Sequence, residues 1–244
     1  MHSILQNAGT VEINPFPHVV IEDALDFYDD FAKTRPPWSW VLDGRTAQPN
    51  HRYDMSAVRA LGREDTPALW REFIYYHVGK TFWHGIWDLF GDWVSEIYGD
   101  AIGYDARTTI RHGNKDADIG LDCQIGGNHA TPISGSVRGP HVDNPVELFA
   151  GMLYMPMGDE DAGGHLEIHR LTGEAVFEGK AELKPGLSEC VKTVPYKANT
   201  AVFFINTPQS IHAVSPRAPC DKPRLLVNFC GDMIGKQLFD LRRT

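Results

Sequence analysis

The second half of the chain is a series of short β-rich segments, and this series narrows the possible folds more than any other feature. After Gly103, about eight segments rich in β-branched and aromatic residues follow, separated by Gly, Pro, Asn or Asp. They are ARTTIRH, IGLDCQIG, LFAGMLYMP, HLEIHR, ECVKTVPY, TAVFFIN, SIHAVSP and RLLVNFCGDM. Many short strands with frequent turns predict an antiparallel sandwich, jelly roll or barrel.

The first hundred residues have a different pattern. Residues 1–20 predict an opening strand whose prolines suit a sheet edge, residues 23–34 a short helix, and residues 37–56 a loop. From Thr66 to Tyr98, apolar residues recur at intervals of three and four, which predicts two helices separated by Gly79, with Thr66 as the first N-cap. We expect their apolar stripe to pack against a sheet; it consists of Trp70, Phe73, Ile74, Phe82, Trp83, Ile86, Trp87, Phe90 and Trp93.

These patterns together predict an α+β fold with a mainly β core. A chain of 244 residues is long enough for a single buried core, and no linker divides it. We therefore expect one domain over residues 1–244. In this prediction residues 1–100 form a mostly helical buttress and residues 104–235 form the β core.

Composition excludes several classes of function. The net charge is −9, with 23 basic and 32 acidic residues, so a large nucleic-acid footprint is disfavoured. Apolar runs fall well short of the roughly 20 residues of a membrane span, and no secretory signal is visible. Four cysteines are scattered without CxxC spacing, which favours free thiols and a cytoplasmic protein over a disulfide framework.

The sequence His141-Val142-Asp143, with His212 further on, has the residue types of a non-haem iron site. Two histidines and one carboxylate can bind one face of an octahedral Fe(II) and leave the other face open. In an extended segment, residues 141 and 143 point to the same side, so both can reach one metal. Taken alone, the same tripeptide could also be an ordinary solvated turn.

The surrounding segments strengthen the metal hypothesis. VRGPHVDNP is followed by LFAGMLYMP, DAGGHLEIH and ANTAVFFINTPQSIHAVSPRAPCDKPRLLVNF. This order resembles the 2-oxoglutarate/Fe(II)-dependent dioxygenases, specifically their prolyl-hydroxylase-like branch, over roughly Leu121 to Asp232. The resemblance implies a double-stranded β-helix (jelly roll) with flanking N-terminal helices. It also implies Fe(II) on His141, Asp143 and His212, with 2-oxoglutarate and O₂ as the co-substrates.

The resemblance assigns further residues to the co-substrate. Arg224 is expected to hold the distal carboxylate of 2-oxoglutarate, and Tyr154 to direct its hydroxyl there. Gln124 stands where the family often has a tyrosine, so its role as a co-substrate contact departs from the pattern. Arg217 competes with Arg224, but it lies in the turn SPRAPCDKP and is expected to be exposed or to face substrate. Three histidines stay open as substrate contacts: His129, His165 and His169.

The implied activity is hydroxylation of an unactivated C–H bond in a small-molecule or amino-acid-like substrate, with release of succinate and CO₂. The Asp143 carboxylate favours hydroxylation over halogenation. A peptidyl, prolyl-type hydroxylase is the alternative within the family. From other classes, a cupin-type metalloprotein that does not use 2-oxoglutarate and a non-catalytic β-sandwich binding module stay open. The aromatic residues of 66–98 could also serve a dimer interface, so oligomerisation stays open too.

Overall fold

The computed structural model describes residues 3–179 and 181–241, and most of its core is β-sheet. The large sheet has seven strands, six of them in the order β1-β10-β5-β12-β4-β2, with β3 paired in parallel to β4. All other pairs in this sheet are antiparallel. The strands are β1 (His18–Ile21), β2 (Arg52–Met55), β3 (Thr108–Ile110), β4 (Ile119–Asn128), β5 (Glu147–Tyr154), β10 (Ala201–Ile205) and β12 (Arg224–Met233).

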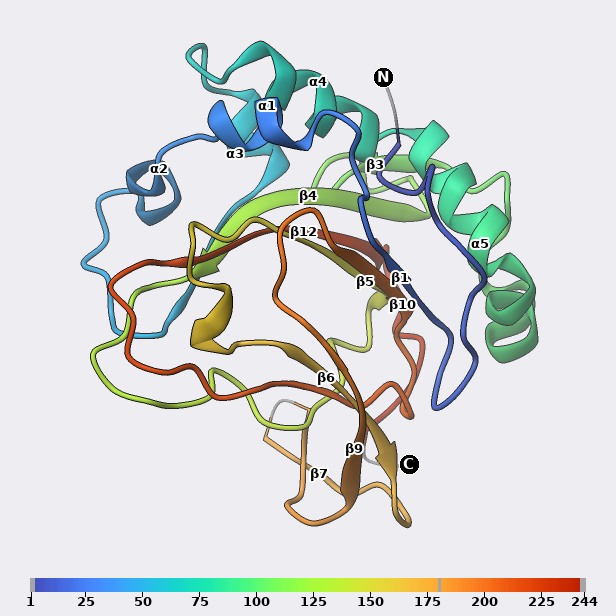
Figure 1. Cartoon of the computed structure of the whole chain (residues 1–244). Helices are drawn as coiled ribbons and strands as arrows, with labels where there is room; N and C mark the ends of the chain where they lie inside the picture. The colour runs from blue at the N-terminus through green and yellow to red at the C-terminus, as the bar shows by residue number, and fades with distance from the viewer. Residues whose placement is uncertain (1–2, 180, 242–244) are drawn as a thin grey trace.

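A smaller antiparallel sheet lies below the large one in Figure 1. Its order is β11-β6-β9, and a separate two-stranded ladder joins β7 to β8. The strands are β6 (Leu166–Leu171), β7 (Phe177–Glu178), β8 (Glu182–Leu183), β9 (Ser188–Val194) and β11 (His212–Val214). Apolar side chains of both sheets, such as Tyr154 and Ile168, share one buried cluster, so the two sheets pack against each other.

Helices cover the opposite face of the large sheet (Figure 1). They are α1 (Tyr28–Lys33), α2 (Trp38–Leu42), α3 (Ala57–Leu61), α4 (Ala68–His77) and α5 (Lys80–Tyr98), with 3₁₀ turns at Gly99–Ala101 and Glu160–Ala162. The rings of Phe73 on α4 and Phe82 on α5 lie 6.1 and 5.9 Å from the ring of Phe229 on β12. This contact confirms that the aromatic stripe packs against a sheet.

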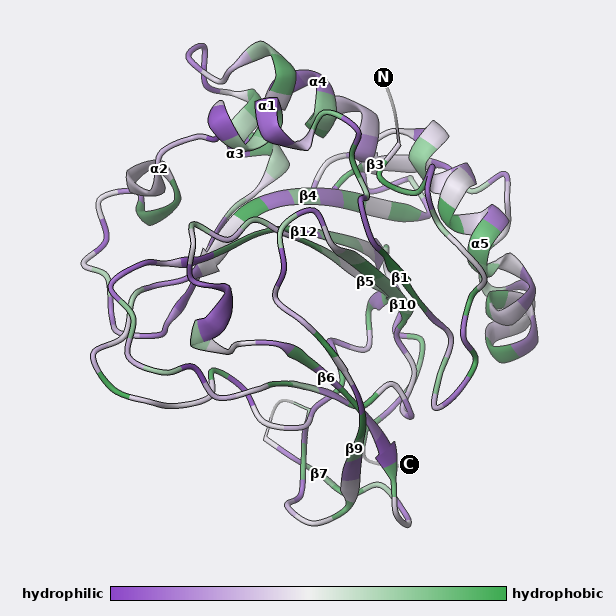
Figure 2. Ribbon diagram, in the orientation of Figure 1, coloured by the Kyte–Doolittle hydropathy of each residue, from purple (hydrophilic) through white to green (hydrophobic). Residues whose placement is uncertain are grey.

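The strands of the large sheet separate apolar from polar residues by alternation. On β4, Leu121, Cys123 and Ile125 belong to the core under the helices, whereas Gln124 faces the space between the sheets. Figure 2 shows this alternation along β4, while β5 and β10 are mostly hydrophobic. Because side chains alternate between the two faces of a strand, one face of the sheet is available for polar chemistry.

The sequence-based predictions hold for most elements. All eight predicted β segments contain a strand, Gly79 separates α4 from α5, and β1 is an edge strand as its flanking prolines indicated. The N-cap prediction was wrong: Pro67 occupies that position, and the Thr66 hydroxyl instead donates to the Ala60 carbonyl at 2.6 Å. All four cysteines are free, and no helix in the described ranges is long and apolar enough to cross a membrane.

The expectation that residues 37–56 form a loop was also wrong, because they contain α2 and β2. The first hundred residues therefore contribute more than a helical buttress. They supply β1 and β2, the strands at the two ends of the main strand order. β2 is held by antiparallel pairing with β4, a long-range contact that a local hydrophobic pattern does not encode.

Candidate metal centre and its cavity

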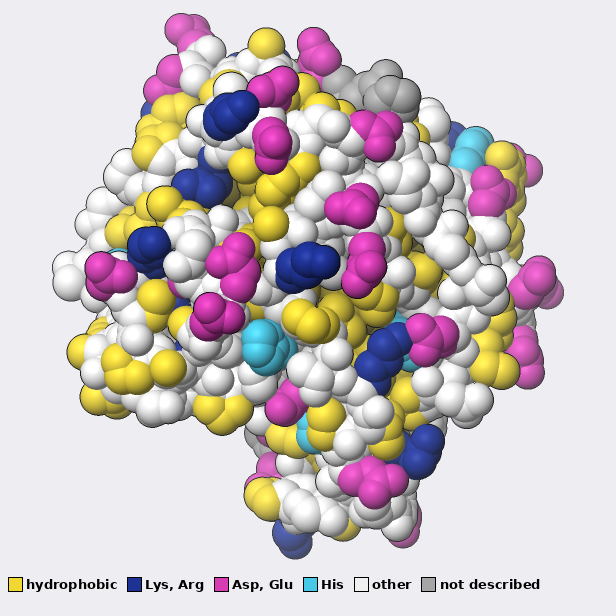
Figure 3. All heavy atoms as spheres, in the orientation of Figure 1, with side chains coloured by type: hydrophobic (Ala, Val, Ile, Leu, Met, Phe, Trp, Pro, Cys, Tyr) yellow, Lys and Arg dark blue, Asp and Glu magenta, His cyan; other side chains and the backbone are white. Residues whose placement is uncertain are grey.

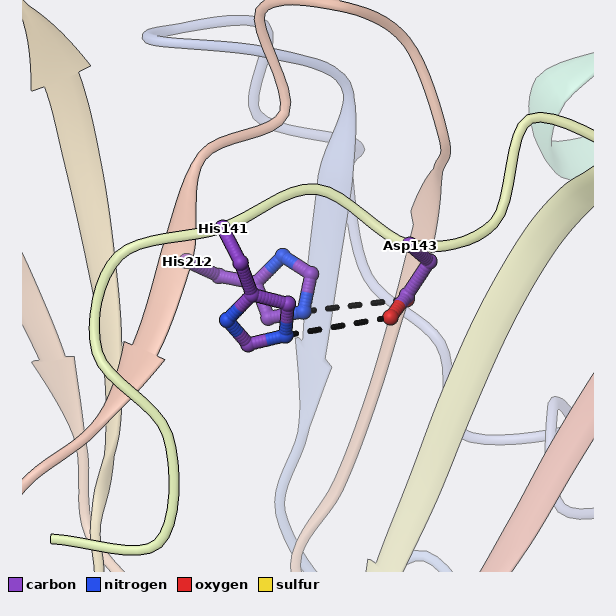
Figure 4. A group of neighbouring side chains, drawn as sticks. All are labelled: His141, Asp143 and His212. Carbon is purple, nitrogen blue, oxygen red and sulfur yellow. Dashed lines mark ion pairs between the residues drawn. The ribbon is translucent and has the colours of Figure 1, made fainter. Parts of the chain in front are cut away.

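The backbone itself brings His141 and His212 together. Each residue donates its N–H to the carbonyl of the other at 2.9 Å, an isolated antiparallel bridge between segments 71 residues apart in the chain. Directly opposed residues of such a pair have adjacent side chains, and the two imidazole rings lie 4.1 Å apart. Asp143 follows two residues after His141 and points to the same side (Figure 4).

The three side chains converge with their donor atoms facing one another. Asp143 Oδ1 lies 3.8 Å from His141 Nε2, and its Oδ2 lies 3.6 Å from His212 Nε2. The other ring nitrogens are already bound: His141 Nδ1 donates to the Gly139 carbonyl at 2.7 Å and His212 Nδ1 to the Ser210 carbonyl at 2.9 Å. Both Nε2 lone pairs are thereby directed at the carboxylate, the arrangement that metal-binding histidines use.

The electrostatics of the cluster suit a divalent cation. Burial, with a further contribution from His212, lowers the pKa of His141 well below its usual range, so its imidazole is neutral near pH 7. Burial alone would raise the pKa of Asp143, but His212, His141 and Arg138 together hold it below its ordinary value. The neutral His141 imidazole, the ionised Asp143 carboxylate and His212 thus offer ligand atoms that all lie within 4.8 Å of one another, a set that suits Fe(II).

The three residues line a cavity of about 280 Å³ between the two sheets. Part of its wall is apolar, formed by Ala150 and Met152 of β5, Leu166 of β6, Phe204 of β10 and Val214 of β11. The Phe204 ring lies 4.7 Å from the ring of His212. An apolar side chain thus lies directly beside one of the candidate metal ligands.

Arg224 lines the same cavity and is only 1% exposed. Its Nε donates to the Gly164 carbonyl at 2.6 Å and its Nη1 to Asn128 Oδ1 at 3.5 Å. Among the described residues, its Nη2 is buried without any hydrogen-bond partner. A buried cation with an unsatisfied donor is costly unless an anion binds there. The site therefore fits a carboxylate ligand.

Tyr154 lies beside Arg224. The guanidinium carbon is 5.3 Å from the centre of the Tyr154 ring and 4.8 Å from that of Tyr196. Within the described part of the chain, the Tyr154 hydroxyl is buried without a hydrogen-bond partner. The cavity wall around Arg224 thus contains a second buried polar group without a hydrogen-bond partner.

Gln124 lies in the cavity wall but away from Arg224. It pairs with Asn228, four residues along β12 from Arg224, which at the rise of a strand is about 13 Å. Its amide is used within the protein: Nε2 donates to Asp122 Oδ2 at 2.9 Å, and Oε1 accepts from Asn228 Nδ2 at 3.1 Å. This position favours the metal side of the cavity over the distal carboxylate of a co-substrate.

Comparison with known proteins supports this arrangement at the level of fold. No family model and no curated protein sequence matches the chain. Among solved structures, a prolyl 4-hydroxylase from Phytophthora capsici superposes with a TM-score of 0.50 at 17% identity, over 88% of this chain and 58% of that one. The fold is that of the prolyl 4-hydroxylases. The described chain thus spans under two thirds of that relative's length.

Two further solved structures align with lower TM-scores. A prolyl 4-hydroxylase from Pseudomonas putida aligns over 89% of this chain and 93% of its own, with a TM-score of 0.45 and 12% identity. A dioxygenase for auxin oxidation from Arabidopsis thaliana, solved with 2-oxoglutarate, aligns over 92% of this chain and 85% of its own, with a TM-score of 0.43 and 13% identity.

Within this prolyl-4-hydroxylase fold, the prediction for Arg217 was wrong. The side chain is fully buried, not exposed, and does not line the cavity. Its guanidinium donates to the carbonyls of His129 and Lys222 at 3.1 and 3.0 Å, and it lies 3.6 Å from Asp159. Arg217 thus ties a turn to its neighbouring segments. The cavity wall also lacks His129, His165 and His169, as far as the described residues go.

Several charged residues that the sequence motifs did not indicate also lie in the cavity wall. They are Arg52 and Asp54 on β2, Arg111 after β3, Arg138 in the segment before His141, and Glu147 on β5. Burial is the largest cause that raises the pKa of Glu147 to about 8; Asp143 and Asp232 add to it, whereas Arg111 and Arg138 oppose it. A signal existed for β2, since Arg52 and Asp54 alternate with Tyr53 and Met55.

Proposed function

We propose that this protein is an Fe(II)- and 2-oxoglutarate-dependent dioxygenase that hydroxylates a C–H bond of a small-molecule substrate. The observation that carries the proposal is the single cavity that contains both parts of the machinery. It combines a metal-ready His141, Asp143 and His212 cluster with the buried Arg224, whose guanidinium has an unused donor. The prolyl-4-hydroxylase fold supports the same assignment.

Each residue has a definite task in this proposal. His141, His212 and Asp143 hold the iron, and Arg224 with Tyr154 holds the distal carboxylate of 2-oxoglutarate through charge-assisted hydrogen bonds. The bound iron, 2-oxoglutarate and O₂ supply the oxidation: one oxygen atom enters the substrate C–OH, the other enters succinate, and CO₂ leaves. Phe204 and Met152 shield the metal side of the cavity from water.

The finer architecture follows the same proposal. The two facing sheets form a double-stranded β-helix, and residues 1–244 form one domain in which the N-terminal helices support the large sheet. The four free cysteines support a reducing compartment such as the cytoplasm. On the face in Figure 3, basic side chains are interspersed with acidic ones, which supports a small substrate over nucleic acid.

A direct test is anaerobic titration of the Fe(II)-loaded protein with 2-oxoglutarate. We expect a metal-to-ligand charge-transfer band near roughly 500 nm in the wild type. His212→Ala removes a metal ligand and should abolish the band, whereas Arg224→Ala should shift its appearance to much higher 2-oxoglutarate concentration. Arg170→Ala, which removes an exposed arginine paired with Glu189, is the matched control and should behave as the wild type.

Absence of the band from iron-replete wild type would overturn the oxygenase assignment. Bound metal without any response to 2-oxoglutarate would then favour the cupin-type alternative, and absence of bound metal would favour the β-sandwich binding module. A peptidyl prolyl-type hydroxylase is the second candidate, favoured by the likeness of the fold. Succinate formation with proline-containing peptides, compared with small molecules, separates the two substrate classes.

A further inference from the structure

Three arginines line the cavity besides Arg224, and each is closely paired with a carboxylate of the protein. Arg52 Nε lies 2.8 Å from Asp54 Oδ1. Arg111 Nε lies 2.7 Å from Asp232 Oδ2, and Arg138 Nε lies 3.1 Å from Glu182 Oε1. These pairs leave little positive charge for a substrate anion.

Glu147 is the carboxylate without a close partner of its own. In the described part of the chain its one ion-pair contact is with Arg111 Nη2 at 3.8 Å, and the better hydrogen bond of that guanidinium goes to Asp232. The neighbouring Cys230 thiol accepts from Arg111 Nη1 at 3.5 Å and carries no positive charge. Glu147 is thus a largely buried carboxyl group whose only nearby ion-pair partner among the described residues is shared with Asp232.

The strand register places Glu147 on the side of the metal position opposite Arg224. Glu147 pairs with Asp232, eight residues along β12 from Arg224. Phe204, whose ring contacts His212, pairs with Ala150, which in turn pairs with Cys230. The metal position therefore lies between the two ends, with the Arg224 end available to 2-oxoglutarate and the Glu147 end available to another molecule.

Glu147 also lies where a second molecule can enter. An outer cavity of about 780 Å³ is lined by Asn144, Phe177 and Phe239 among others. It shares Arg138, Asp143 and Glu147 with the inner cavity. A compound in the outer cavity thus meets Glu147 and the proposed metal ligand Asp143 at the boundary that the two cavities share, and Met152 and Phe204 line the inner cavity.

We propose that Glu147 binds a protonated amine of the substrate, and that the substrate class is small aliphatic or alicyclic amines, including amino compounds with a basic nitrogen. Oxidation of such an amine rests on the proposed oxygenase function. Binding of the amine depends only on Glu147. An ammonium donates strong, charge-assisted hydrogen bonds to a carboxylate.

The first experiment compares ligands that share one skeleton and differ in charge. Cyclohexylamine, cyclohexanol and cyclohexanecarboxylate are titrated into the full chain loaded with Zn(II) and 2-oxoglutarate, followed by calorimetry. We expect the amine to bind at least about tenfold more tightly than the alcohol, and the carboxylate to bind most weakly. Equal affinities for the amine and the alcohol, or a higher affinity for the carboxylate, would overturn the proposal. This test uses the wild-type protein alone.

The second experiment removes the charge and keeps the shape. Glu147→Gln should eliminate the preference for amine over alcohol, whereas Glu189→Gln, at an exposed carboxylate of β9, should retain it. Retention of the preference in Glu147→Gln contradicts the proposal.

The charge-transfer band that 2-oxoglutarate produces with Fe(II) separates the amine hypothesis from the oxygenase hypothesis. A normal band without amine preference defeats only the amine assignment. Amine preference without the band defeats only the oxygenase assignment.

Discussion

At the residue scale, the orientation of the Arg224 guanidinium depends on the backbone of Gly164. Gly164 has φ +76°, a conformation that residues with a side chain rarely adopt, and its carbonyl accepts from Arg224 Nε. A Cβ at this position would lie 2.9 Å from Arg224 Cδ. The pair Gly163-Gly164 thus allows the backbone to approach and orient the guanidinium.

We predict that Gly164→Ala destabilises the protein by about 1–3 kcal/mol, because it forces a non-glycine residue into a strained conformation. It should also raise the 2-oxoglutarate concentration needed for half-saturation, because Arg224 must move. Chemical unfolding and the charge-transfer titration measure the two effects. Gly173→Ala, at a glycine with no heavy atom within 4 Å of the added Cβ, serves as the control. Unchanged stability of Gly164→Ala would contradict the strain argument.

The residues of the candidate metal site could be predicted from the sequence because they belong to a short motif. The charged residues of the cavity wall could not be predicted in this way. His141 and Asp143 need only their own spacing to share one side of an extended segment. Arg138 and Glu147 lie within six residues of that motif, yet their positions depend on residues far along the chain. Arg138 forms an ion pair with Glu182, and Glu147 pairs with Asp232 in the sheet. Arg217 was misplaced for the same reason, since its acceptor carbonyls belong to two separate segments.

At the scale of elements, Phe82 joins α5 to three strands of the large sheet. Its ring lies 5.9 to 6.3 Å from the rings of Phe229, Phe149 and Phe203, which belong to three different strands. The helix was predictable because its apolar residues recur with helical spacing over 19 residues. α2 and β2 are only five and four residues long, so even the alternation within β2 covers too few residues to identify a strand.

We predict that Phe82→Ala lowers the free energy of unfolding by about 3–5 kcal/mol, the usual cost of removing a fully buried phenylalanine. Tyr75→Ala on α4 removes an aromatic ring that is 56% exposed and should change stability by about 0.5 kcal/mol or less. Urea titrations of both variants measure the difference. Similar losses of unfolding free energy in the two variants would mean that the packing of α5 on the sheet does not depend on Phe82.

At the scale of the whole molecule, the candidate metal site exists only when the chain is folded. His141 and His212 meet through the bridge between their backbones, and His212 is also held by the pairing of β11 with β6. Ligands that bind only the folded state stabilise that state in proportion to the logarithm of their concentration. Metal and co-substrate should therefore act on global stability.

We predict that Mn(II) in large excess raises the melting temperature of the wild type by about 5–11 °C, and that 2-oxoglutarate raises it further. This range corresponds to ~2.7 kcal/mol at a hundredfold excess over Kd for a chain of this size. EDTA should reverse the shift. His212→Ala should lose most of it, and His51→Ala, at an exposed histidine, should keep it. An equal shift in His212→Ala would place the metal elsewhere, for instance near Glu147, Cys230 and Asp232.

The pairing of β1 with β10 has a consequence for synthesis on the ribosome. Ile21 pairs with Ala201, so the first strand to emerge remains without its neighbour until about 180 further residues have been translated. A nascent chain that carries β1 and the aromatic helices thus has exposed apolar surface for most of its elongation. Since domains fold as units and unpaired strands invite aggregation, this chain should depend on molecular chaperones until β10 has emerged.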